Sequence, residues 1–193
     1  MAELALNNIF INYFGARDVI HSFTHTFTGG LNVIYGAEGS GKTTLLKAIA
    51  GLVHIKEGSI QLDGKEYSEV RIREKGIAMV FDDLALRNRR CVRYNLELPL
   101  RLRKFAPEII RERVGAVSAE FGLSSGIMDV AVFRLSEEYK VRIALARAFM
   151  RESKILIFDN PFARLSPDIR EELFLLLLGH IRKSETVVIY ATD

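Results

Sequence analysis

The sequence predicts an α/β fold with a mostly parallel sheet, because short buried strands alternate with amphipathic helices along the chain. Apolar runs at residues 31–35, 77–81 and 155–158 have the composition of strands that are covered on both faces. Each run is followed by a segment in which apolar residues recur at helical spacing. We also expect an antiparallel β piece at the N-terminus and an α-helical insertion in the middle of the chain.

The N-terminal part of the chain predicts the antiparallel piece. Residues 4–14 and 19–27 alternate loosely between apolar and polar side chains, as half-buried strands do, and Gly29-Gly30 predicts a turn before the next strand. Residues 58–65 predict a further short strand with an Asp-Gly turn at residues 63–64.

Helical patterns dominate the second half of the chain. Residues 84–123 are apolar at helical intervals, and Pro99 and Pro107 are expected to break this segment. We interpret residues 84–134 as a helical subdomain within a single domain that spans residues 1–193. The remaining predicted elements are a helix at residues 138–149, a helix that begins at Ser166-Pro167 and a last strand at residues 186–190.

Composition is typical of a globular protein, since 49% of the 193 residues are hydrophobic and 26% are charged. Cys91 is the sole cysteine, which excludes a disulfide framework and favours a reduced setting. The first residues lack the basic and apolar regions of a signal peptide, and the longest apolar run, residues 173–178, is too short to cross a bilayer. We therefore expect a cytoplasmic protein, so that any peripheral association with the membrane must come through a partner.

A glycine-rich loop between the strand at residues 31–35 and a helix carries the clearest chemical signal. Its sequence, Gly-Ala-Glu-Gly-Ser-Gly-Lys-Thr, fits the pattern G-x-x-x-x-G-K-[ST] in the strand–loop–helix setting that this pattern requires. The glycines let backbone N–H groups point at one anion, and the helix N-terminus adds partial positive charge. The alternative is a glycine-rich turn that binds nothing, and the Lys-Thr pair, the loop length and both flanks argue against it.

Two side chains of this loop have defined roles in phosphate chemistry. Lys42 can reach the β- and γ-phosphates of a nucleoside triphosphate, and the Thr43 hydroxyl can ligate Mg²⁺. ATP and Mg²⁺ are therefore the predicted cofactors. The predicted ATP-binding residues of the loop are Gly36, Ala37, Glu38, Gly39, Ser40, Gly41, Lys42, Thr43 and Thr44.

A buried strand that ends in Asp159 predicts a second phosphate element. The carboxyl ends of parallel strands are where α/β sheets bind ligands, and a carboxylate there can hold Mg²⁺ directly or through water. An apolar strand followed by aspartate is a weak signal by itself. The glycine-rich loop on the same chain makes it strong, so Asp159 joins Thr43 as a predicted metal ligand.

The run Leu-Ser-Glu-Glu-Tyr-Lys-Val-Arg-Ile-Ala-Leu-Ala-Arg-Ala at residues 135–148 resembles the signature of ABC-type ATPases, which is L-S-G-G-Q followed by an A-x-A-R-A helix. Other segments before and after this run resemble further motifs of the family and occur in the family's order and spacing. The resemblance therefore covers essentially the whole chain. It implies a P-loop NTPase core. It also implies that Phe14 stacks on adenine, that Asp82 is a metal ligand at the Q-loop position, and that Ser136 contacts the ATP of a second protomer.

Departures from the family pattern concern the groups of hydrolysis. Asn160 replaces the glutamate that polarises the attacking water, and the loss of a general base typically lowers the rate by about 10²–10⁴. Asp193 replaces the switch histidine and would repel the γ-phosphate, Asp82 replaces a glutamine, and Ser166 replaces an aspartate. We therefore expect ATP binding with weak hydrolysis.

Glu137 and Glu138 replace both glycines of the signature. In the family this loop meets the γ-phosphate held by the opposite protomer, and each like-charge pair at about 4 Å costs roughly 1 kcal/mol in water and about 4 at an effective dielectric of 20. A second interpretation is that Ser136 caps a helix whose first turn is acidic, which the helix macrodipole favours. Both can hold, so that the cap stabilises the protomer while the acids oppose dimer closure.

A basic stretch with few acidic residues lies in the predicted helical subdomain. It is interpreted as a solvated helical face, as a docking surface for a membrane subunit, or as a nucleic-acid patch. Few aromatic residues are interleaved with it, which argues against nucleic acid. Its basic residues are Arg87, Arg89, Arg90, Arg93, Arg101, Arg103, Lys104, Arg111 and Arg113.

The resemblance implies three alternative functions. The leading one is the ATP-binding subunit of an ABC transporter, which couples ATP binding to a transmembrane permease subunit through the helical subdomain. The second is a catalytically weak regulatory or scaffolding protein beside a competent second nucleotide-binding subunit. The third is a soluble ABC protein that acts on nucleic acid.

Overall fold

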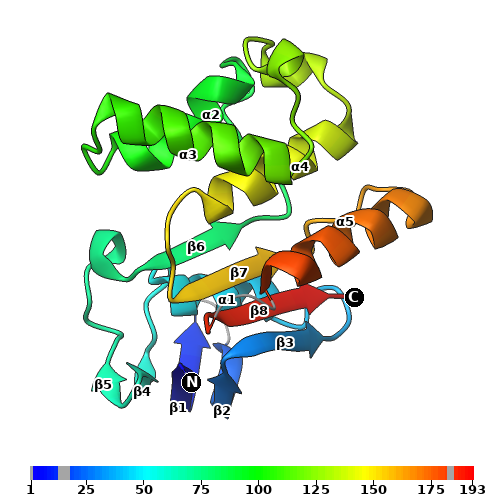
Figure 1. Cartoon of the computed structure of the whole chain (residues 1–193). Helices are drawn as coiled ribbons and strands as arrows, with labels where there is room; N and C mark the ends of the chain where they lie inside the picture. The colour runs from blue at the N-terminus through cyan, green and yellow to red at the C-terminus, as the bar shows by residue number, and fades with distance from the viewer. Residues whose placement is uncertain (1, 13–17, 182–184) are drawn as a thin grey trace. The chain divides into compact units, whose positions relative to one another are not determined.

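Figure 1 shows the computed structural model of the chain, which describes residues 2–12, 18–181 and 185–193. The chain divides into two units. The first contains residues 1–79, 153–160 and 181–193, and the second contains residues 80–152 and 161–180. The predicted helical subdomain, residues 84–134, lies within the second unit.

A four-stranded sheet in the order β3-β8-β7-β6 holds the strands that were predicted from the apolar runs (Figure 1). β3 and β7 both pair with β8 in parallel, and every residue of β7 is buried, as expected for a strand that is covered on both faces. This sheet confirms the predicted α/β class. Its strands are β3 (Gly30–Tyr35), β6 (Ile77–Val80), β7 (Ile155–Asp159) and β8 (Val187–Thr192).

A second four-stranded sheet, in the order β2-β1-β4-β5, confirms the predicted antiparallel piece. Its strands are β1 (Glu3–Asn12), β2 (Asp18–Thr28), β4 (Glu57–Leu62) and β5 (Lys65–Glu66). Asn8 has φ 51° and interrupts the register of β1, so that Leu4 and Leu6 before it and Ile9 after it are all buried. Asp63 (φ 51°) and Gly64 (φ 73°) form the predicted turn between β4 and β5, with the left-handed values that a two-residue hairpin turn needs.

Helix α1 (Lys42–Ala50) joins the two sheets of the first unit into one core. Its side chains Leu45, Leu46 and Ile49 belong to a single buried cluster with apolar side chains of β1, β4, β7 and β8. The helix thus packs against strands of both sheets. This packing matters for the site, because the loop before α1 carries the predicted phosphate-binding residues.

Helices α2, α3 and α4 pack on one another in the second unit (Figure 1). Leu96 of α2, Val114 of α3 and Val141 of α4 are among their buried side chains. Among the described residues, no helix is both long and apolar enough to span a membrane. The helices are α2 (Val92–Arg101), α3 (Pro107–Glu120), α4 (Glu137–Phe149) and α5 (Pro167–Ile181), with 3₁₀ turns η1 (Ile72–Glu74), η2 (Ser125–Ile127) and η3 (Val132–Arg134).

Two details of the helical segment correct the sequence prediction. Pro99 does not break α2 but lies inside it, two residues before its last residue, Arg101, where the missing N–H removes one bond of the last turn only. The segment also becomes helical only at Val92. Residues before it form turns, in which Leu84 (φ 61°) and Ala85 (φ 43°) have left-handed backbone that a helix cannot accommodate. Pro107 opens α3 at its first position, as proline favours.

Candidate functional site

The glycine-rich loop runs from the end of β3 at Tyr35 to the start of α1 at Lys42. Gly39 (φ 77°) and Gly41 (φ 92°) have left-handed backbone, which side chains disfavour. A Cβ atom at Gly41 would lie only 2.8 Å from Cδ1 of Ile20. The loop therefore needs its glycines for shape, and the backbone N–H groups at the start of α1 are the kind of group that binds anions.

The ammonium group of Lys42 is held inside the loop. It donates to the carbonyl oxygens of Gly36 and Ala37, the latter at 2.9 Å, and to Oδ1 of Asp193 at 2.7 Å. Only 11% of the Lys42 side chain is exposed. The residue predicted to bind phosphate thus lies in the loop, together with the residue at the switch-histidine position.

Thr43 and Asp159 meet next to Lys42, as a magnesium site at the loop requires. The Thr43 hydroxyl donates to Oδ1 of Asp159 at 3.1 Å, and Asp159 is 2% exposed. A hydroxyl and a carboxylate are hard oxygen ligands of the kind that Mg²⁺ prefers. The residues present therefore fit the ion that was predicted from the sequence.

Asn160 and Asp193 lie side by side because of the parallel register of the sheet. Asp159 pairs with Ala191 and Tyr35 pairs with Thr192, so the residues after these pairs emerge at the same edge. Asn160 Nδ2 donates to Oδ2 of Asp193 at 3.0 Å. Asn160 also has φ 45°, a left-handed conformation that asparagine tolerates better than glutamate.

Asp82 lies in the second unit, in a turn with unusual backbone. Its Oδ1 accepts from the N–H of Asp83 at 2.9 Å. The left-handed residues Leu84 and Ala85 follow, and the Arg147 guanidinium donates to both of their carbonyl oxygens at 2.7 Å. Burial lowers the pKa of Arg147, but an arginine stays charged at physiological pH. Arg147 of the signature helix thus holds the turn after Asp82.

The signature segment begins α4 in the way that the capping interpretation predicts. Ser136 Oγ accepts from the N–H of Tyr139 at 3.4 Å, and the first turn of the helix carries Glu137 and Glu138. Each acid is paired within its own helix, since Lys140 Nζ lies 2.6 Å from Glu137 Oε1 and Arg142 Nε lies 2.9 Å from Glu138 Oε1. The negative charge of this turn is therefore partly neutralised.

Arg142 is a structural residue that the sequence prediction did not single out. Its guanidinium donates to Glu138, to Glu172 of α5 at 2.5 Å and to the carbonyl oxygen of Phe121 at 3.4 Å. Burial would lower the pKa of Arg142, but the bonds to Glu172 and Glu138 outweigh it and raise the pKa. The spacing of Glu138 and Arg142 on one helix was a signal for the first of these contacts.

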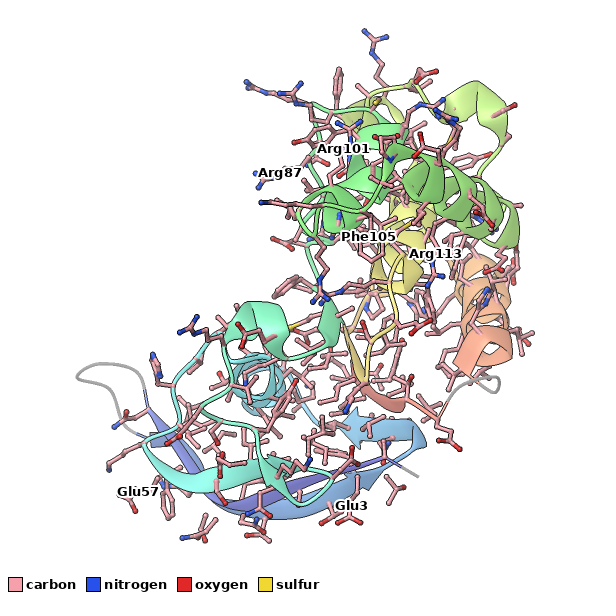
Figure 2. The ribbon with its side chains drawn as sticks, turned by 60° about the vertical axis from the view of Figure 1, so that its left-hand side comes forward. Glu3, Glu57, Arg87, Arg101, Phe105 and Arg113 are labelled. Carbon is pink, nitrogen blue, oxygen red and sulfur yellow. The ribbon has the colours of Figure 1, made fainter. Side chains whose placement is uncertain are left out.

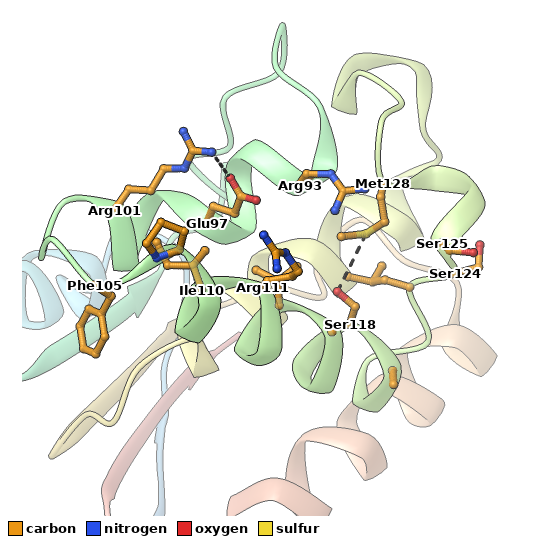
Figure 3. A pocket seen from close by; sticks show the side chains of 15 residues that line it. Arg93, Glu97, Arg101, Phe105, Ile110, Arg111, Ser118, Ser124, Ser125 and Met128 are labelled. Atoms are coloured by element: carbon orange, nitrogen blue, oxygen red, sulfur yellow. Dashed lines mark hydrogen bonds and ion pairs between the residues drawn. The ribbon is translucent and has the colours of Figure 1, made fainter.

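Three arginines of the basic stretch, Arg93, Arg101 and Arg111, line a cavity of about 1090 Å³ in the second unit. Figure 2 shows Arg101 and Arg113 on helices α2 and α3 and Arg87 in the segment before α2, and Figure 3 shows the cavity between α2 and α3. Apolar groups of Ile110, Val114 and Phe105 line it beside Arg93 and Arg111. Two of these arginines already have acidic partners, since Arg93 pairs with Asp129 and Arg101 pairs with Glu97.

The structure describes all predicted site residues except one. Phe14, which the resemblance assigns to adenine stacking, lies outside the described residues. The first unit brings together the loop residues Gly36 to Thr44 with Asp159, Asn160 and Asp193. Asp82 and Ser136 belong to the second unit.

Comparison with known proteins gives related sequences over the full chain. The family model described as ABC transporter matches residues 23–163. The sn-glycerol-3-phosphate import ATP-binding protein UgpC of Bordetella pertussis is 34% identical over 193 residues, which is 100% of this chain and 53% of that protein. The protein of the same name from Paracoccus denitrificans is 32% identical and is covered over 55% of its length. The chain thus spans about half the length of these relatives.

Solved structures with the same architecture have similar descriptions. The structure of cbiO1 from Clostridium perfringens, part of the ABC transporter complex cbiONQ, superposes with a TM-score of 0.86 and 26% identity, covering 98% of this chain and 78% of that one. MJ1267, an ATP-binding cassette of an ABC transporter in its ADP conformation, gives a TM-score of 0.84 over 100% of this chain and 82% of that one. At 22% identity the second likeness concerns the fold alone.

Proposed function

Because the chain belongs to the ABC transporter family, we propose that it is the ATP-binding subunit of a membrane transporter. One observation carries the proposal: Lys42 lies in the glycine-rich loop beside the contact of Thr43 with Asp159. The loop and its lysine would hold the phosphates. Thr43 and Asp159 would hold Mg²⁺, which neutralises phosphate charge when it is bound.

Replacement of Lys42 by alanine tests this site. We expect Lys42→Ala to weaken binding of an ATP analogue by at least about tenfold, because a charge-assisted bond to phosphate is lost. Lys47→Ala is the matched control, since Lys47 lies in the last turn of the same helix. Isothermal titration with Mg²⁺ present measures both. Equal affinity of Lys42→Ala and wild type would refute the assignment.

Import is the direction of transport that the relatives support, since the Bordetella and Paracoccus proteins are named for import. We propose that a transmembrane permease docks on the second unit, in the cavity between α2 and α3. Its apolar floor, Ile110 and Val114, and Arg111 beside them fit an amphipathic helix of the permease that carries acidic residues.

A crosslink from the cavity tests the docking surface. A photoreactive residue in place of Phe105 is expected to capture a polytopic membrane protein from native membranes, because Phe105 lines the cavity and is 42% exposed. The same residue in place of Lys65, an exposed position of the first unit, is the control and should capture none. Capture of nucleic-acid-binding proteins alone would contradict a permease partner.

Asn160 and Asp193 favour a second candidate function. A chain with an amide in place of the general base, and a carboxylate bound to Lys42, would bind ATP but hydrolyse it slowly. Such a chain would act as a regulatory subunit beside a competent second nucleotide-binding subunit. The steady-state rate of phosphate release distinguishes the two candidates. A very slow rate favours the regulatory subunit, and a rate in the ordinary enzyme range favours the first candidate.

A further inference from the structure

Asp193 is bonded to two groups of the phosphate site at once. Its Oδ1 accepts from Lys42 Nζ at 2.7 Å, and its Oδ2 accepts from Asn160 Nδ2 at 3.0 Å. The register explains this position. Thr192 pairs with Tyr35, the last residue before the loop, so Asp193 lies directly beside the loop entrance.

The three donors of the Lys42 ammonium are all engaged. Two bond to the neutral carbonyl oxygens of Gly36 and Ala37, and the third bonds to the Asp193 carboxylate. An ammonium group has three N–H donors, so a phosphate that binds Lys42 must displace one of these partners. Asp193 is the charged partner of the three, and it lies where Lys42 would meet the terminal phosphate.

We propose that Asp193 acts as an internal competitor of the γ-phosphate and makes this site favour nucleoside diphosphates over triphosphates. The inference rests on the proposed function, because it assumes that the loop binds nucleotides. A diphosphate can use the backbone N–H groups of the loop, and its β-phosphate can replace a carbonyl partner of Lys42, so that the Lys42–Asp193 pair stays in place. A triphosphate must either break that pair or place its γ-phosphate against the carboxylate, and both disfavour it.

The exposure of the pair is consistent with competition. The Lys42 side chain is 11% exposed and that of Asp193 is 55% exposed. The carboxylate can therefore leave for solvent, whereas the lysine is held in the loop. ATP can therefore displace Asp193 without a steric obstacle. The preference for ADP then depends on how tightly Lys42 binds the carboxylate compared with the γ-phosphate.

The test measures ADP and ATP affinity side by side, by isothermal titration with Mg²⁺ in excess. In the wild type we expect ADP to bind more tightly than ATP. In Asp193→Asn, which keeps the shape and removes the charge, we expect ATP affinity to rise by about tenfold and ADP affinity to change by less than about threefold. Asp193→Glu keeps the charge and should retain the preference for ADP.

A matched control is Glu69→Gln, which removes one negative charge from an exposed position of the same unit and should change neither affinity. Weaker ATP binding in Asp193→Asn would overturn the inference, because Asp193 would then assist the triphosphate, for instance through the metal. Equal tightening of ADP and ATP would also overturn it and indicate a general charge effect. If neither nucleotide binds any of these chains, the proposed function fails and the inference fails with it.

Discussion

At the scale of single residues, we expect Asn160 and Asp193 to determine how fast this site hydrolyses ATP. The amide of Asn160 can orient a water molecule but cannot take its proton, and the carboxylate of Asp193 accepts hydrogen bonds where the family has a donor. The two side chains are bonded to each other at 3.0 Å. A change at one of them therefore alters the surroundings of the other, and their effects on hydrolysis will not add.

Restoring the general base alone should give little activity. In Asn160→Glu the new carboxylate would face Asp193, and glutamate would have to adopt φ 45°, which costs of order 1 kcal/mol or more. We expect Asn160→Glu combined with Asp193→His to raise phosphate release by about 10² or more over wild type, and the single variant by much less. Steady-state phosphate assays of the isolated chain measure both.

Asn88→Glu, an exposed position in the second unit, controls for added charge. The explanation fails if wild type already turns over in the ordinary enzyme range of about 1–10³ s⁻¹, or if Asn160→Glu alone gives the full gain.

Residue spacing predicted part of this site and could not predict the rest. The pattern around Lys42 was sufficient because the loop chemistry tolerates few other spacings. Lys42 and Asp193 are 151 residues apart, however, and their contact depends on the register of β3 and β8. The ion pairs of Glu137 and Glu138 could likewise not be predicted, because helical spacing allows such pairs but does not determine the side-chain rotamers that form them.

At the scale of elements, a reciprocal clamp joins the end of β5 to the turn η1. The Tyr67 hydroxyl donates to the carbonyl oxygen of Lys75 at 2.7 Å, and Lys75 Nζ donates to the carbonyl oxygen of Tyr67 at 2.5 Å. The ammonium also lies 3.9 Å from the centre of the Tyr67 ring. Lys75 is 2% exposed, and its burial lowers its pKa although the nearby Glu66 carboxylate opposes the shift.

The lowered pKa of Lys75 predicts a stability that depends on pH. Between the folded pKa and the unfolded value of 10.5, the unfolded chain binds a proton that the folded chain does not, so the free energy of unfolding rises with pH in this window. Below the window the folded state carries the full cost of the buried charge. Urea unfolding of wild type and Lys75→Met across the alkaline range should show the rise in wild type and not in the variant.

At neutral pH, Lys75→Met should leave the free energy of unfolding unchanged or raise it by about 1 kcal/mol, because a buried charge is replaced by an apolar chain of similar length. The exposed Lys65→Met is the control and should keep the alkaline rise of wild type. A loss of several kcal/mol in Lys75→Met would show that the clamp contributes more than burial of the charge costs.

Element types followed from the sequence more closely than element ends did. Periodicity and the Asp-Gly turn gave the strands and most helices, since these signals are local. Pro99 was misjudged because proline near a C-terminal turn removes only one bond, and the turns at Leu84 and Ala85 depend on Arg147, which lies more than 60 residues away in sequence.

At the scale of the whole molecule, we expect the signature acids, Glu137 and Glu138, to oppose association of two chains. In the closed dimer that the family implies, Glu137 and Glu138 of one protomer would face the γ-phosphate of the other. The ion pairs with Lys140 and Arg142 reduce this repulsion, but the side chains of Glu137 and Glu138 are still 45% and 31% exposed. Partly exposed carboxylates therefore remain at the turn that begins α4.

We expect the wild-type chain to stay monomeric with ATP and Mg²⁺, and Glu137→Gln/Glu138→Gln to form an ATP-dependent dimer. Glutamine is preferred to glycine because glycine in a helix costs about 1 kcal/mol per residue. Removing like charges at about 4 Å is worth roughly 1 kcal/mol each in water and more in a dry interface, so the dimer dissociation constant should fall by about tenfold or more.

The gain in dimer affinity should shrink as salt screens the charges. Sedimentation with and without ATP decides the matter, with Glu108→Gln/Glu112→Gln, at two exposed positions of α3, as an equal charge change. Tight ATP-dependent dimerisation of the wild type would show that Lys140 and Arg142 neutralise the acids fully.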